Sequence, residues 1–170
     1  MAQRQRQRDR GSHEREPREF NDRVLDLARV TRVTKGGKRM RFRAAVIIGD
    51  GKGRVGLGVA KGTDVAAAVS KANRQARKHL LVIPLVHGTI PHEVRDKFGA
   101  ARILIKPAPE GTGVKAGGAM RVVLELAGVP NVVGKTLGTS NKINNAKAMM
   151  HALASLRERA PTPPPPPVTP

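Results

Sequence analysis

Residues 34–61 read TKGGKRMRFRAAVIIGDGKGRVGLGVAK, and this stretch decides the fold of the first half of the chain. From Met40 to Ile48 the even positions are apolar, whereas the odd positions begin with Arg39, Arg41 and Arg43. Successive side chains of a strand point to opposite faces of its sheet. The alternation therefore predicts a strand with one apolar face and one face that begins with three guanidinium groups.

Two glycine-rich turns flank this strand. Gly49-Asp50-Gly51-Lys52-Gly53 joins it to a second predicted strand over residues 54–61, and Lys35-Gly36-Gly37-Lys38 precedes it. In the second strand Gly56 and Gly58 alternate with valine and leucine, so we expect bare backbone on the face that carries the arginines. The predicted sheet has arginine, lysine and exposed backbone on one surface and a basic turn at each end.

This surface allows three interpretations: a dinucleotide-binding site, an RNA-binding site or a solvated basic face with no ligand. The run Gly51 to Gly56 fits the pattern GxGxxG, but a dinucleotide site needs a helix there and an acid about 20 residues later. A strand follows instead, and residues 70–78 contain no acid. Arginine beside glycine favours close contact with phosphates. We predict an RNA-binding site formed by Lys35, Gly36, Gly37, Lys38, Arg39, Arg41, Arg43, Lys52 and Arg54.

The composition points to a polyanionic partner. The net charge is +19, from 32 Lys and Arg against 13 Asp and Glu, which suits nucleic acid or an anionic membrane surface. No apolar run approaches the roughly 18 residues of a membrane span, and the absence of cysteine excludes a disulfide framework. With three phenylalanines as the only aromatic residues, base stacking is not expected to carry recognition.

The rest of the chain divides into four predicted parts. Residues 1–18 are expected to form a disordered basic arm, 19–82 an N-terminal domain, 83–159 a C-terminal domain, and 160–170 a proline-rich tail. In the first domain we expect a leading strand over residues 25–34. A helix capped by Thr63 and ending near His79 should cover the apolar face and leave the arginine face open.

The second domain is predicted to alternate strands and helices. Its sheet is expected to begin at Ile83, with strands over residues 101–106 and 131–137. One helix should span residues 118–127 and end at Gly128, and another should follow a cap at Ser140 or Asn141. The inward stripe of the last helix is predicted to contain Ile143, Ala146, Met150 and Leu153.

No motif predicts catalysis. The glycine-rich turn over residues 110–118 opens a helix, so it fits a structural turn or protein contact, an RNA phosphate contact or a nucleotide site. The run GVPNVVGKT over residues 128–136 has one residue too many between its glycines for a phosphate-binding P-loop. None of the five histidines has a partner at metal-ligand spacing. We expect neither an enzyme nor a cofactor nor a metal site.

Longer motifs resemble one family. The run KGGKRMRFRAAVIIGDGKGRVGLGVAKGTDVAAAVSKA is similar to the signature region of small-subunit ribosomal protein five of the bacterial type. The runs GTIPHEV, FGAARILIKPAPEGTGVKAGGAMRVVLELAG and GTSNKINNAKAMMHAL resemble its second domain, in the same order. The resemblance implies an α+β fold of two small two-layer α/β domains. The first would be a double-stranded-RNA-binding-like sheet plus helix, and the second a βαβα domain with a left-handed crossover, where ordinary connection rules predict a right-handed one.

The resemblance also implies a function. A structural constituent of the small ribosomal subunit would bind rRNA near the decoding region and the mRNA entry channel, supporting assembly and translational accuracy in the cytoplasm. Its neighbours would be the fourth and eighth small-subunit proteins, with protein contacts at Gly99, Arg102, Glu110, Gly111 and Thr112. A free double-stranded-RNA-binding module and a nucleotide-binding enzyme built on the second domain are the alternatives.

Overall fold

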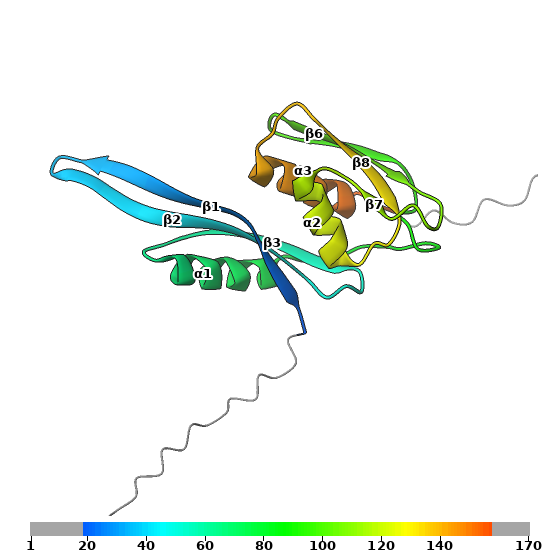
Figure 1. The fold of residues 1–170 in the computed structure, drawn as a ribbon, viewed down its shortest axis with the longest axis horizontal. Helices are drawn as coiled ribbons and strands as arrows, with labels where there is room; N and C mark the ends of the chain where they lie inside the picture. Colours follow the sequence, from blue (N-terminus) through cyan, green and yellow to red (C-terminus); the bar gives the residue numbers. More distant parts are fainter. Residues whose placement is uncertain (1–18, 158–170) are drawn as a thin grey trace, which may run out of the picture.

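The computed structural model describes residues 19–157, which form two four-stranded sheets (Figure 1). The first sheet is antiparallel, in the order β1-β2-β3-β4. Its strands are β1 (Asn21–Thr34), β2 (Gly37–Gly49), β3 (Arg54–Gly62) and β4 (Leu80–Val82), and α1 (Val65–Lys78) connects the last two. The predicted disordered arm and proline-rich tail lie outside the described residues.

The second sheet has the order β5-β6-β8-β7, and its β7–β8 pair is parallel. Its strands are β5 (Val94–Phe98), β6 (Ala101–Pro107), β7 (Val114–Lys115) and β8 (Val132–Leu137). The helices are α2 (Gly118–Ala127), between β7 and β8, and α3 (Lys142–Ala154). Two small α/β domains are thus present, as predicted. The handedness of the β7–α2–β8 crossover and the boundary at residues 82 and 83 stay predictions.

One face of the first sheet packs tightly against α1. The shared core contains Ala44, Val46, Ile48, Ala60, Ala68, Ala72 and Ala76. Gly58 lies opposite Val46 in the β2–β3 pair, so it points to the same face, where an added Cβ would lie 2.0 Å from the Ala72 carbonyl oxygen. The prediction that Gly56 and Gly58 expose backbone beside the arginines was therefore wrong. These glycines let α1 approach the sheet closely.

The opposite face of the first sheet is covered by the second domain over its inner half. Ile47, Val55 and Ile83 join a buried cluster that includes Ile103 and Leu124 of the second domain. Because β2 is buried on both faces at this end, the arginine face is open only at its outer end. The expectation of a fully open face was wrong, since it did not allow for the second domain.

The turn between β2 and β3 joins the two domains. The amide of Gly51 donates to the Leu126 carbonyl at 3.0 Å, and that of Gly53 donates to the Ala127 carbonyl at 2.8 Å. The last carbonyls of a helix lack partners within the helix, so the turn caps the C-terminal end of α2. A Cβ on Gly49 would lie 2.1 Å from the Leu126 oxygen, which shows how closely the backbones meet.

Several predicted element boundaries differ from the structure. Asp64 rather than Thr63 occupies the N-cap of α1, and Ile83 lies outside both sheets, with its amide donating to the Gly53 carbonyl at 2.8 Å. The second sheet begins instead at β5, a charged strand that the sequence analysis missed together with β7. In α2 the predicted bounds and the left-handed Gly128 cap are confirmed.

The cap of α3 is also confirmed, but its inward stripe is shifted. The Asn141 side chain accepts from the amides of Ile143 and Asn144. The buried residues are Asn145, Ala146, Ala148, Met149, Ala152 and Leu153, whereas Ile143 and Met150 are half-buried. The helix is thus turned so that a polar residue, Asn145, enters the interior.

Candidate nucleic-acid interface

The outer parts of β1 and β2 form a two-stranded ribbon that extends past α1 (Figure 1); we call residues 28–43 the hairpin arm. Every residue from Thr31 to Arg41 is exposed. The hairpin arm carries seven basic residues and no acid. They are Arg29, Arg32, Lys35, Lys38, Arg39, Arg41 and Arg43. Cations concentrated on a protruding ribbon suit a polyanion.

Strand pairing gathers three of these cations and the neighbouring Lys61 around a shallow groove. Arg32 lies opposite Arg39, Val30 opposite Arg41, and Arg43 opposite Lys61. The groove has a volume of about 250 Å³ and is lined by Val30, Thr31, Arg32, Arg39, Arg41 and Lys61. The sequence analysis missed Arg32 and Lys61. The sequence did contain a signal for Arg32. Assigning a two-residue turn at Lys35 and Gly36 sets Thr34 opposite Gly37, and this register places Arg32 beside Arg39, as the structure does.

The turn at the tip of the hairpin arm is open to solvent. Thr34 Oγ1 donates to the Gly37 carbonyl at 3.0 Å, and Gly37 has a φ of 132°, which favours glycine. A Cβ on Gly36 would meet nothing within 4 Å among the described residues. Lys35 and Lys38 are both exposed. The predicted turn residues are thus free to contact a large ligand.

Arg43 differs from the other two arginines of the predicted row. Its guanidinium donates to Asp26 Oδ2 at 3.3 Å, and its side chain is half-buried at the base of the hairpin arm. Its Nε is buried and has no hydrogen-bond partner in the part of the chain that the structure describes. Arg43 therefore helps to hold β1 against β2, while Arg39 and Arg41 remain exposed.

Arg54 is engaged in a network at the other end of the sheet. Its Nε donates to Asp50 Oδ2 at 2.6 Å, a second nitrogen donates to Glu19 Oε1 at 2.9 Å, and the guanidinium lies 5.0 Å from the centre of the Phe20 ring. Lys52 is exposed, but both residues lie at the far end of β2, about 40 Å from the tip of the hairpin arm along a 13-residue strand. The structure does not bring them together with the other predicted site residues.

Asp50 organises this turn as a buried carboxylate. Burial would raise the pKa of Asp50, but hydrogen bonds from the Arg54 side chain and from the backbone amides of Lys52 and Arg54 outweigh it, lowering the pKa from 3.8 to about 2. The Asp50 side chain is only 3% exposed, so solvent does little to screen the pair. The ionised form is the one that the fold stabilises.

This lowered pKa predicts a loss of stability in acid. The contribution of ionised Asp50 should be complete above the unfolded pKa, near 4, and disappear as the pH falls through about 2. The shift corresponds to about 2 kcal/mol of unfolding free energy. Urea unfolding of the wild-type chain and of Asp50→Asn across this pH range measures it. If the free energy of the variant falls in parallel with that of the wild type, other carboxyls cause the acid sensitivity.

The predicted protein-contact residues fall into two groups. Gly99, with a φ of 60°, lies in the β5–β6 turn, and Arg102 is exposed near the start of β6. Glu110, Gly111 and Thr112 follow the other end of that seven-residue strand, about 20 Å away. The structure does not unite them in one patch, and their role stays a prediction.

The glycine-rich turn over residues 110–118 is fixed by its own chain. The amide of Gly113 donates to Asn131 Oδ1 at 3.1 Å, and the Gly113 carbonyl accepts from Val132 at 3.1 Å. Asn131 is buried and also binds the Gly88 carbonyl at 3.5 Å. These contacts favour the structural-turn interpretation, because the amide and the carbonyl of Gly113 already have hydrogen-bond partners within the chain.

Within residues 19–157, no group of three or more His, Asp or Glu side chains could hold a metal ion. None of the helices described is both long and apolar enough to cross a membrane.

Comparisons with known proteins agree over both domains. Residues 20–84 match the family model for the N-terminal domain of ribosomal protein S5, and residues 96–161 match that for its C-terminal domain. Over 140 residues, 82% of this chain, it is 52% identical to a small ribosomal subunit protein uS5 of Gloeobacter violaceus. Over the same length it is 49% identical to a small ribosomal subunit protein uS5c of Spinacia oleracea. The matched region spans 63% and 46% of those two relatives.

Proposed function

The chain belongs to the ribosomal protein S5 family, and from this membership we propose that it is a structural component of the small ribosomal subunit that binds rRNA through the hairpin arm. The observation that carries the proposal is the protruding ribbon with seven basic residues and no acid. The family is one of structural ribosomal proteins and not of enzymes. The cations of the hairpin arm would neutralise crowded phosphates and position the protein on folded RNA.

A rigid connection between the domains supports this role. The β2–β3 turn fixes α2 through two backbone hydrogen bonds, and a buried cluster continues from the first sheet into the second domain. RNA held by the hairpin arm would therefore keep a fixed position relative to whatever contacts the second domain. Such a two-domain wedge suits the assembly of a large ribonucleoprotein.

The finer details of the proposal follow from the family resemblance. The bound rRNA would lie near the decoding region and the mRNA entry channel, where the protein would support subunit assembly and translational accuracy. The fourth and eighth small-subunit proteins would be its neighbours, with Gly99, Arg102 and the loop at residues 110–112 as candidate contacts. We place the particle in the cytoplasm.

Co-sedimentation tests membership of the particle. The full chain, tagged at one end and expressed in a bacterial host, is expected to migrate with the small subunit in a sucrose gradient and to stay bound through a high-salt wash. Many simultaneous contacts in a folded particle resist salt, whereas an isolated set of phosphate contacts loses affinity steeply as salt rises.

The opposite result identifies the alternative. Release into the low-molecular-weight fractions at high salt, with binding to any duplex RNA at low salt, would indicate a free double-stranded-RNA-binding module. A charge-matched basic protein from outside the ribosome serves as the control for nonspecific adhesion.

A further inference from the structure

The hairpin arm has a second face, opposite the one that carries Arg39 and Arg41. Directly paired residues of β1 and β2 lie on the same face of the sheet, and the even positions of β2 define this second face. At its inner end these positions are Ala44, Val46 and Ile48, which pack under α1. Further out the series continues with Phe42, Met40 and Lys38, whose partners in β1 are Arg29, Thr31 and Val33. We call this the α1-side face of the hairpin arm.

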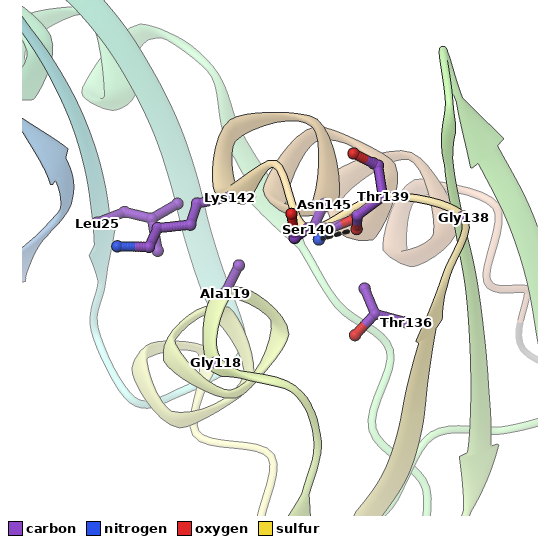
Figure 2. Close-up of a pocket in the computed structure, with 9 residues that line it drawn as sticks. All are labelled: Leu25, Gly118, Ala119, Thr136, Gly138, Thr139, Ser140, Lys142 and Asn145. Atoms are coloured by element: carbon purple, nitrogen blue, oxygen red, sulfur yellow. Dashed lines mark hydrogen bonds between the residues drawn. The ribbon is translucent and has the colours of Figure 1, made fainter. Parts of the chain in front are cut away.

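Neither cover of the first sheet reaches the tip of this ribbon. On the α1 side, Phe42 is the outermost residue of β2 that packs against the core shared with the helix. On the other side, Leu25 packs against the second domain and lines a cavity of about 710 Å³ there, together with Lys142 and Asn145 of α3 (Figure 2). Beyond these contacts the ribbon protrudes alone (Figure 1).

Two large apolar side chains are exposed on the α1-side face near the tip. Val33 is 73% exposed and Met40 is 51% exposed. Val33 pairs with Lys38, so Met40 is its diagonal neighbour, about 7 Å away. Exposed apolar side chains that gather on one surface mark an interaction site. A surface that binds only phosphates does not need them, because valine and methionine donate no hydrogen bond to a phosphate oxygen.

Cations surround this apolar pair. Arg29 and Lys38 lie on the same face, Lys35 lies in the turn, and all three are exposed. Residues 28–43 contain no acid. Apolar side chains among lysines and arginines are typical of segments that lie in the headgroup region of an anionic bilayer. There the apolar groups enter the lipid, and the long basic side chains extend back to the phosphates.

The shape of the hairpin arm favours a lipid surface over a protein partner. Peptides bind in grooves or along the edges of sheets. Val33 and Met40 lie instead on the open face of a ribbon that protrudes past α1 (Figure 1). A protruding tip can enter a soft, planar surface, and the net charge of +19 matches the negative potential of an anionic bilayer.

We propose that the chain, when it is not bound to RNA, binds anionic phospholipid bilayers through the tip of the hairpin arm. Val33 and Met40 enter the headgroup boundary, and Arg29, Lys35 and Lys38 contact the lipid phosphates. This is a second binding activity, beyond the rRNA-binding function proposed above. Because both ligands use the same arm, RNA and the bilayer exclude each other. The bilayer would hold the free chain, and RNA would release it.

The first experiment sediments the full chain with vesicles of one part phosphatidylglycerol to two parts phosphatidylcholine at physiological salt. Vesicles of phosphatidylcholine alone should bind far less, because each cation near an anionic surface raises the partition coefficient by about fivefold. The joint variant Val33→Ser and Met40→Ser should lower the partition coefficient by roughly tenfold, since less apolar area enters the lipid. This variant loses no charge, so the salt dependence of its binding to small-subunit rRNA should equal that of the wild type.

The chain offers a matched control for the serine variant. Val82 and Leu137 are 70% and 48% exposed, close to the values for Val33 and Met40, but they lie on β4 and β8, outside the hairpin arm. Their joint replacement with serine should leave vesicle binding unchanged. Equal losses in the two serine variants would overturn the proposal, because exposed apolar area anywhere on the chain would then account for binding.

The second experiment places a fluorescent reporter at the tip. The chain contains no tryptophan, so a single one reports only its own surroundings. The emission of Val33→Trp is expected to shift to shorter wavelength when the anionic vesicles are added, because the indole leaves water for the headgroup boundary. The emission of Val82→Trp should not change. An excess of small-subunit rRNA should reverse the shift of Val33→Trp by displacing the bilayer from the arm.

The outcomes separate this proposal from the proposed function. No binding to the anionic vesicles, or binding without a shift of Val33→Trp, would overturn the lipid proposal alone. Vesicle binding that depends on Val33 and Met40, together with rRNA binding that no variant of the hairpin arm weakens, would overturn the RNA-binding role of the arm alone. A shift of Val33→Trp that needs no vesicles and grows with protein concentration would assign the face to a second copy of the chain and overturn the lipid proposal.

Discussion

Replacing Arg32, Arg39 and Arg41 together with alanine is expected to weaken binding to small-subunit rRNA by roughly a hundredfold at physiological salt. All three are exposed and line one groove, so each is positioned to neutralise a phosphate. Each lost contact should lower the log–log slope by about 0.9. The fold should be retained, because these side chains lie outside both buried clusters. Filter binding across a salt series measures the change.

The control for this variant carries the same change in net charge at another place. Lys97, Lys115 and Lys135 are exposed on strands of the second sheet, and their joint replacement with alanine also removes three positive charges. We expect a much smaller loss of affinity. Equal losses in the two triple variants would mean that overall charge, and not the groove of the hairpin arm, determines binding. Arg43 is left unchanged in both because it pairs with Asp26.

Gly58→Ala is expected to destabilise the first domain by about 3–5 kcal/mol. The added Cβ would lie 2.0 Å from the Ala72 carbonyl oxygen and 2.8 Å from the Ala76 nitrogen. Both atoms belong to the backbone of α1, which cannot turn aside as a flexible side chain would. The whole helix would have to move off the sheet. The loss is comparable to the total stability of many domains, about 5–15 kcal/mol.

Urea unfolding compares this variant with Gly36→Ala. Gly36 has open space around it among the described residues, and it is not one of the glycines with positive φ. Its replacement should therefore change the unfolding free energy by no more than about 0.5 kcal/mol. A Gly58→Ala chain as stable as the Gly36→Ala chain would show that α1 does not pack against β3 as closely as described.

The sequence predicts the hairpin well but not what covers its faces. Period-two alternation correctly identifies the strand that carries Arg39 and Arg41, because alternation is a local property. Whether Gly58 points toward α1 or toward the arginines depends on the β2–β3 register, and a register shift of one residue reverses every side chain. The glycines were therefore assigned to the wrong face.

The sequence also indicates the contact between the domains, but by a continuous apolar run and not by period-two alternation. Residues 44–48 read AAVII, which is apolar at odd and even positions alike. Such a run is typical of a strand that is buried on both faces, and here α1 and the second domain supply the two covers. β5 was missed for the opposite reason, since the sequence VRDKF has too much charge to suggest a strand.

The candidate site was predicted in part. The basic tip and two exposed arginines follow from composition and spacing, whereas Lys61 enters the groove only through pairing with a third strand. Arg54 was assigned to RNA, together with Lys52, because arginine beside glycine favours close contact with phosphates. In the structure its guanidinium donates hydrogen bonds to the carboxylates of Asp50 and Glu19, and Glu19 lies 35 residues away in the sequence.

The turn that caps α2 also bears on the order in which the chain folds during synthesis. Residues 49–53 are made before residues 118–127, and they belong to a hairpin whose contacts are close in sequence. A ten-residue helix is too short to persist alone in water. We expect the hairpin to hold the amides of Gly51 and Gly53 in place before α2 emerges, so that they can receive its last carbonyls. We therefore expect the first domain to act as a template on which the second domain completes its helix.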